Sequence, residues 1–110
     1  MKPDIIAEVY FYKTEDGGRK DPIVQHQHPQ LSLKEGEYFA YSCPLEIKGN
    51  YYDCRMILND VGDLQLGVKY IVPIKILDSE TVLKIIEENE AFGIWESGIK
   101  GEGRIIEILK

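Results

Sequence analysis

The sequence predicts a small all-β protein, either a barrel or a sandwich. Short segments rich in β-branched and aromatic residues recur along the chain, and turn residues separate them roughly every ten positions. Only one segment has the apolar spacing of a helix. These observations predict about five to seven strands and one short helix. The length of 110 residues fits a single domain over residues 1–110.

Residues 4–12 give the clearest strand prediction. Apolar side chains recur at every second position and share one face: Ile5, Ala7, Val9 and Phe11. Aliphatic and aromatic residues also occupy the other face, so we expect this strand inside a barrel or sandwich rather than at a wet edge. Residues 14–22 contain two glycines, two aspartates and a proline, and they predict a loop.

Two further strands are predicted in the middle of the chain. Residues 38–43 have strand composition, the apolar spacing continues to Ile47, and residues 51–58 form the third strand. A turn at residues 48–50 joins them. Pro44 is expected to end the second strand or to place it at an edge, because proline has no N–H to donate to a ladder.

A long strand and the helix follow. Residues 68–77 alternate with their apolar side chains on one face, and Pro73 on the opposite parity predicts a bulge or an unpaired stretch. Residues 79–88 predict the helix, with a narrow apolar stripe at spacings of three and four. Asp78 or Ser79 can cap it.

The last strand pair is predicted over residues 92–108. Phe92, Ile94 and Glu96 share one face of the first strand, and Trp95 lies on the other. The segment Gly98 to Gly103 superficially resembles a phosphate-binding loop, but no helix follows it, so we interpret it as a hairpin turn. Its glycines are expected where the chain turns or passes close to another backbone.

Charge and hydropathy limit the classes of function. The net charge is −6 and the chain has no basic run, which is not typical of a nucleic-acid-binding protein. No apolar run approaches the roughly 20 residues that span a bilayer, and the polar start of the chain does not resemble a signal peptide. We therefore predict a cytoplasmic protein with no membrane partner.

Four residues form the only candidate metal or nucleophile set: His26, His28, Cys43 and Cys54. Their spacing matches no common zinc module, so two loop histidines and two free thiols are the preferred interpretation. A disulfide would need Cys43 and Cys54 to face each other across a hairpin. Cys43 or Cys54 as a nucleophile is the weaker alternative, since a buried free cysteine usually acts as a small hydrophobic residue.

Several motifs resemble the third, C-terminal β-barrel domain of translation elongation factor Tu. That domain opens with an Ala-Glu-Val-Tyr strand and a Gly-Gly-Arg…Pro loop, and it closes with a Phe-x-Ile-x-Glu-x-Gly…Gly-x-Gly hairpin. The matching segments here are Ala7-Glu8-Val9-Tyr10, Gly17-Gly18-Arg19 with Pro22, Pro29-Gln30-Leu31, Val72-Pro73-Ile74, Phe92-x-Ile94-x-Glu96-x-Gly98 and Gly101-x-Gly103. The resemblance is firm at both ends of the chain and weak over residues 34–67.

The resemblance implies a six-stranded antiparallel closed barrel. In that family the GTPase chemistry belongs to a separate domain, so no GTP binding is expected here. The family's barrel contacts the T stem of aminoacyl-tRNA, the exchange factor and the GTPase domain. The resemblance implies these contact residues: Gly17, Gly18, Arg19 and the turn Glu96-Ser97-Gly98.

The chain departs from the family pattern where the family has basic groups. Lys20-Asp21 replaces the family's His-Thr, and His28 replaces an arginine. Trp95 replaces a basic residue, and the closing turn is reduced to Ile99-Lys100. Each lost phosphate contact lowers affinity for tRNA.

Three hypotheses follow for the function. The preferred one is a non-catalytic, free-standing barrel without a cofactor that binds a protein partner through residues 17–19 and 95–98. Such a protein would be a toxin-immunity protein or a translation-factor-related protein. The alternative is an RNA-binding module that contacts tRNA. The third is a zinc-dependent or cysteine hydrolase that uses the histidines and cysteines.

Overall fold

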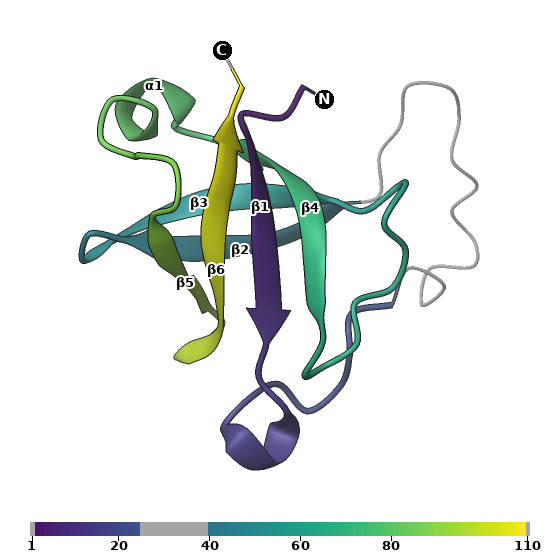
Figure 1. Ribbon diagram of the computed structural model, residues 1–110. Coiled ribbons are helices and arrows are strands. Elements are labelled where there is room, and N and C mark those ends of the chain that lie inside the picture. Colours follow the sequence, from purple (N-terminus) through teal and green to yellow (C-terminus); the bar gives the residue numbers. More distant parts are fainter. Residues whose placement is uncertain (1, 25–39, 110) are drawn as a thin grey trace.

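The computed structural model describes residues 2–24 and 40–109, and they form an antiparallel β-structure (Figure 1). Its strands are β1 (Ile5–Phe11), β2 (Ala40–Ile47), β3 (Asn50–Ile57), β4 (Lys69–Ile76), β5 (Ala91–Trp95) and β6 (Ile99–Ile108). The short 3-10 helix η1 (Thr14–Asp16) follows β1, and the α-helix α1 (Ser79–Val82) lies between β4 and β5.

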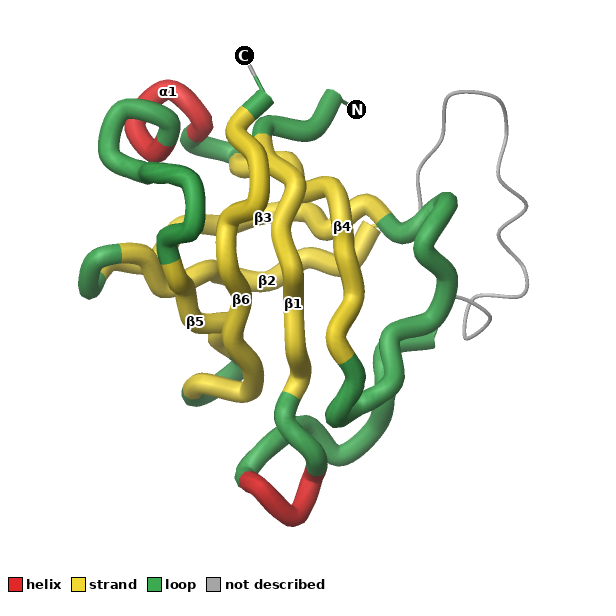
Figure 2. Tube along the Cα trace, in the orientation of Figure 1, coloured by secondary structure: helices red, strands yellow, loops and turns green. Residues whose placement is uncertain are grey.

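The six strands close into a barrel in the order β1-β4-β3-β2-β5-β6, with β6 paired back onto β1. Every pairing is antiparallel. Figure 2 shows β2 and β3 crossing behind β4, β1 and β6 at a steep angle, as the walls of a small barrel do. This architecture confirms the predicted fold class.

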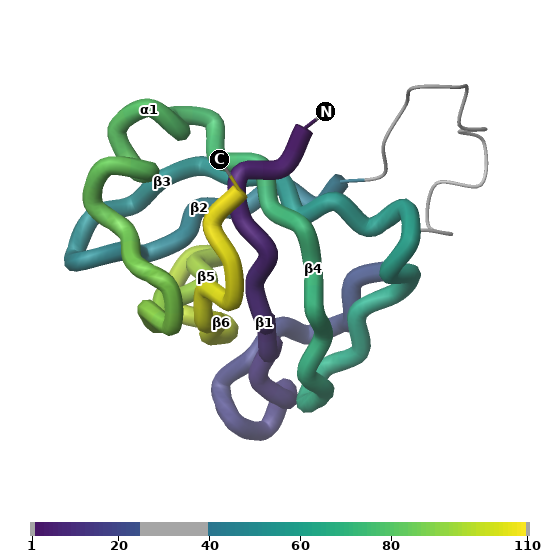
Figure 3. The backbone as a smooth tube through the Cα atoms, turned by 45° about the horizontal axis from the view of Figure 1, so that its top comes forward, coloured from purple at the N-terminus to yellow at the C-terminus, as the bar shows by residue number. Residues whose placement is uncertain are grey.

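The two ends of the described chain lie together at one end of the barrel (Figure 3). The N–H of Leu109 donates to the Asp4 carbonyl at 2.9 Å, and the Asp4 N–H donates to the Ile74 carbonyl at 2.8 Å. The Asp4 side chain also accepts from the Ile76 N–H at 2.8 Å and lies 3.1 Å from Lys75 Nζ. These bonds join β6, the segment before β1, and β4 at this end.

Alternate side chains of each strand fill the interior. All four predicted inward residues of β1 are buried, which confirms the period-two interpretation. The fully buried large side chains come from every part of the barrel wall and from the loop before β4: Ile5, Val9, Phe11, Leu45, Ile47, Met56, Leu64, Val72, Ile74, Ile76, Ile94 and Ile105. Burial of this apolar set is the main stabilising contribution to the fold.

The prediction that Pro44 ends its strand is wrong, whereas the predicted unpaired stretch at Pro73 is confirmed. Pro44 does not end β2, because it lies inside the strand opposite Asp53 of β3. It is tolerated because β5 pairs only with the next two residues of β2. Pro73 causes no bulge in the β1–β4 ladder, where it faces Ile6, but the β3–β4 ladder stops at Ile74. An unpaired stretch is therefore present on one side of Pro73.

The predicted helix is shorter than expected. The α-helix covers only Ser79–Val82, and the Asp78 side chain makes no capping hydrogen bond. Turns continue to Asn89, which adopts a positive φ of 69°. The apolar stripe is nevertheless buried through Val82 and Ile86, so tertiary contact rather than helix length accounts for the pattern.

The β5–β6 hairpin has a tighter turn than predicted. Only Gly98 lies in the turn, with φ at 127°, whereas Gly101 and Gly103 lie inside β6. A Cβ on Gly101 would lie 2.6 Å from the Tyr10 carbonyl oxygen, and one on Gly103 would overlap the Phe92 ring. These glycines let β6 pack closely against β1 and leave room for Phe92, as expected for close backbone approach.

Candidate functional site

The structure brings the two predicted contact segments together at one end of the barrel. Arg19 follows η1 near the start of the chain, and Glu96 begins the turn after β5. Arg19 Nε lies 3.0 Å from Glu96 Oε1, and both side chains are about one quarter exposed. Lys100 Nζ donates to the Gly17 carbonyl at 3.4 Å, which adds a second link between the loop and the hairpin.

The Arg19 guanidinium is held on two sides. Its central carbon lies 5.4 Å from the centroid of the Tyr41 ring, a cation–π distance. The Tyr41 ring meets the ring of the buried Phe11 edge to face at 6.1 Å, so Tyr41 lies between the arginine and the barrel core. Among the described residues, Arg19 Nη1 and Glu96 Oε1 are buried without a hydrogen bond of good geometry. The Arg19–Glu96 contact is therefore mainly ionic.

Burial governs the ionisation of Glu96. Loss of solvation raises the pKa of this carboxyl above its ordinary value, and the nearby charges of Arg19 and Lys100 only partly oppose that effect. Arg19 is thus paired with a carboxylate whose charged form is disfavoured by burial. An arginine engaged in this way has little freedom to bind an external phosphate.

The predicted glycines are explained by the backbone. Gly17 adopts a positive φ of 90° and its N–H caps η1 by donating to the Thr14 carbonyl. A Cβ on Gly18 would overlap the Tyr12 carbonyl. Ser97 and Gly98 both adopt positive φ in the closing turn. These residues shape the two loops, and no contact role is needed to account for them.

Trp95 forms the second part of the candidate site. It is 36% exposed at the end of β5, and its ring lies 5.8 Å from that of Tyr51 with the planes inclined by 67°. Tyr51 comes from β3 and is 58% exposed. With Pro44 of β2, the two rings line an apolar depression of about 300 Å³. We call these three residues the aromatic pocket.

Sequence reasoning named Trp95 but missed the rest of the aromatic pocket. No pattern in the sequence placed Tyr51 beside Trp95, and Pro44 was predicted only to end its strand or to place it at an edge. The strand register explains why they meet. Pro44 and Glu46 are alternate outward residues of β2. Glu46 faces Tyr51 of β3 on one side and Gly93 of β5 on the other, and Trp95 lies two positions after Gly93. Alternation predicted the outward faces, but the β2–β5 pairing could not be read from the sequence.

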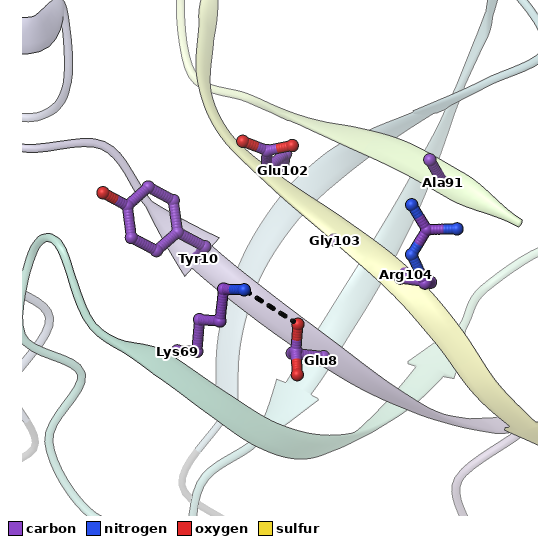
Figure 4. Close-up of a pocket in the computed structure, with 7 residues that line it drawn as sticks. All are labelled: Glu8, Tyr10, Lys69, Ala91, Glu102, Gly103 and Arg104. Carbon is purple, nitrogen blue, oxygen red and sulfur yellow. Dashed lines mark ion pairs between the residues drawn. The ribbon is translucent and has the colours of Figure 1, made fainter. Parts of the chain in front are cut away.

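A second cleft lies on the outer face of β4, β1, β6 and β5 (Figure 4). It has a volume of about 400 Å³, and its charged residues are Glu8, Lys69, Glu102 and Arg104. Figure 4 shows the Lys69 amine directed toward Glu8, and Nζ lies 3.8 Å from Oε1. Arg104 Nη1 donates to the Asn89 carbonyl. Two carboxylates balance two cations, so the cleft has no net formal charge.

The cysteines face each other, as the disulfide alternative requires, but both are free thiols. Cys43 and Cys54 are paired in the β2–β3 ladder and are buried inside the barrel. The hydrogen bond with Cys43, together with burial, raises the pKa of the Cys54 thiol well above its ordinary range. A thiol that stays protonated at neutral pH is a weak nucleophile.

The zinc hypothesis combines two cysteines within the described residues with two histidines outside them. His26 and His28 lie outside the described residues. Within residues 2–24 and 40–109, no cluster of three or more histidine, cysteine or acidic side chains is arranged to hold a metal ion. Over the same ranges, no helix has both the length and the apolar character needed to cross a bilayer.

The fold places the chain among small closed antiparallel β-barrels. No protein-family model matches it, and a search of curated proteins finds no significant relative. The resemblance to the elongation-factor barrel therefore remains a prediction based on the motifs quoted above.

Proposed function

We propose that the protein is a non-catalytic binding module that engages a protein partner. The observation that carries this proposal is the aromatic pocket, which leaves Trp95 and Tyr51 exposed over Pro44. Tryptophan and tyrosine are the residue types that most often anchor protein interfaces, because they bury a large area at a small cost in conformational entropy. The ionic contact between Arg19 and Glu96 lies beside the pocket, because Glu96 directly follows Trp95 in the chain.

The contacts that the basic residues already make favour a protein partner over tRNA. Arg19 is engaged by Glu96 and Tyr41, and Lys100 is directed to the Gly17 carbonyl. Phosphate binding would have to break these contacts, and the net charge of −6 opposes the approach of a polyanion.

The resemblance to an elongation-factor barrel favours a partner related to translation. A toxin inhibited by this chain is the other partner that suits a small acidic binding module. We place either interaction in the cytoplasm, where a reducing environment would keep Cys43 and Cys54 as thiols.

Affinity capture with the full chain from extracts of the source cells tests the proposal. We expect one protein at stoichiometric level with the wild type, loss of that protein with Trp95→Leu, and retention with Ile71→Ala. Ile71 is the matched control because it is an exposed apolar residue of β4, away from the aromatic pocket. Recovery of no stoichiometric protein, or equal recovery with Trp95→Leu, contradicts the proposal.

A filter-binding assay with tRNA at low salt tests the RNA alternative. We expect no retention of tRNA. Retention that Arg19→Ala weakens would replace the protein-binding proposal with the RNA-binding one.

A further inference from the structure

We infer that the aromatic pocket binds one basic side chain, a lysine or an arginine, of an extended partner segment. This inference deepens the proposed function, because it rests on a protein partner and states the chemistry of that partner. It is carried by the ring geometry of the pocket and by the charges of the strand positions around it.

The two rings form a corner that suits an alkyl stem with a charged end. Their centroids are 5.8 Å apart and their planes are inclined by 67°, with Pro44 completing the lining. A cation within about 6 Å of an aromatic centroid is attracted by the ring quadrupole, and tryptophan is the strongest such partner. The volume of about 300 Å³ admits a single side chain rather than a folded element.

The outward positions around the pocket are acidic. One row across the barrel wall runs from Tyr51 through Glu46 to Gly93. Beside it, Asp53 faces Pro44 and Trp95 faces Ile99. Residues opposed in adjacent strands share a face, so these side chains lie on the outside of the barrel. These positions hold two carboxylates, Glu46 and Asp53, and no lysine or arginine, so a cation is favoured there and an anion is disfavoured.

Of the nearest cations, Lys48 in the β2–β3 turn is paired with a carboxylate, and Arg55 of β3 is bonded to a backbone carbonyl. Lys48 Nζ lies 2.8 Å from Glu90 Oε2, and Arg55 Nη1 donates to the Cys54 carbonyl at 3.0 Å. Glu46 Oε1 accepts from the Gly49 N–H, which orients the carboxylate but does not neutralise its charge. Glu46 therefore keeps its charge for an incoming cation, whereas Asp53 shares the outer face of β3 with the charged Arg55.

The chain contains one tryptophan, so its indole N–H resonance and its fluorescence report on the pocket directly. The probes are fluorescently labelled peptides in which glycine alternates with lysine, norleucine or glutamate. Norleucine keeps an aliphatic stem and removes the charge. We expect the lysine peptide to shift the Trp95 indole resonance saturably and to bind about three- to thirtyfold more tightly than the norleucine peptide, with no binding of the glutamate peptide.

Variants locate the effect. Trp95→Leu and Tyr51→Leu should each weaken the lysine peptide about threefold or more, measured by fluorescence anisotropy, while Ile71→Ala leaves its affinity unchanged. Glu46→Gln and Asp53→Asn should weaken it and reduce its salt dependence, whereas Glu80→Gln, on the exposed surface of α1, should not. An unchanged amide spectrum outside the pocket verifies that each variant is folded.

Equal affinity for lysine and norleucine peptides overturns the inference, as does lysine binding that Trp95→Leu leaves unaffected. The outcome separates this inference from the proposed function. Loss of a captured partner with Trp95→Leu, together with no preference for lysine, removes the inference and leaves the proposed function standing. Pocket-dependent lysine binding without any captured partner supports the inference about the pocket and contradicts the proposed function.

Discussion

The contact between Arg19 and Glu96 joins the first loop of the chain to its last hairpin, and a double-mutant cycle can measure its strength. The perturbations are Arg19→Met, Glu96→Gln and the combination. Methionine keeps an apolar stem against Tyr41, and glutamine keeps the shape of the glutamate. Neither substitution is at Ser97 or Gly98, the turn residues that hold positive φ.

The magnitude follows from the geometry. Unit charges about 4 Å apart attract by about 4 kcal/mol at the effective dielectric near a protein surface. Here Arg19 Nε and Glu96 Oε1 are 3.0 Å apart, but each side chain is about one quarter exposed and the hydrogen-bond direction is poor. We therefore expect a coupling energy of about 1–3 kcal/mol. Arg19→Met alone should cost about 2–3 kcal/mol, because it leaves a largely buried carboxylate without its cation.

Urea unfolding followed by tryptophan fluorescence supplies the four free energies of unfolding. The double variant should be more stable than the sum of the single losses predicts, by the coupling energy. Tyr52→Phe, a partly buried residue of β3, is a control that should not couple to Glu96. Additivity of Arg19→Met and Glu96→Gln within about 0.5 kcal/mol would refute the ionic contact as a link between the loops.

Three further predictions concern ionisation, packing and thiol chemistry. Burial raises the pKa of Glu96 above 4.5, so the stability that the protonated carboxyl contributes is full below that pH and is lost as the pH rises through the folded-state pKa. Glu96→Gln should remove this loss in unfolding curves collected between acidic and neutral pH. A pH profile that Glu96→Gln leaves unchanged argues against the raised pKa. Gly103→Ala should destabilise the barrel by about 1–3 kcal/mol in urea, whereas Gly93→Ala, whose Cβ would meet only the side chains of Ile99 and Glu46, should cost less. Equal costs would contradict the close approach of β6. Cys43 and Cys54 should react with a thiol reagent only as fast as the barrel opens, and rapid labelling of the native protein would show that they are accessible.

The sequence predicted the barrel wall well, because strand alternation has a direct physical cause. Inward and outward residues of β1 follow from a period of two, and the buried set of Ile5, Val9 and Phe11 agrees with it. The helix was overextended because Val82 and Ile86 have helical spacing in a segment that forms mostly turns. Burial of that stripe against the barrel satisfies the same pattern without a long helix.

The candidate site was predictable only in part. Motif resemblance indicated both Arg19 and Glu96, but no local pattern shows that two residues from opposite ends of the chain touch. The aromatic pocket depends on the register of three strands, so Trp95 could be named while Pro44 could not. Gly101 and Gly103 were expected near another backbone, but Phe92 as the side chain that requires Gly103 emerges only from the packed structure.

The central claim is that the barrel uses the aromatic pocket and its acidic surround to bind a basic segment of a protein. A map of amide chemical-shift changes, recorded on the labelled chain as the captured partner is added, tests it most directly. The largest changes should cluster at Tyr51, Trp95 and the flanking positions Glu46 and Asp53. Changes centred instead on the cleft that contains Glu8 and Arg104 would contradict it.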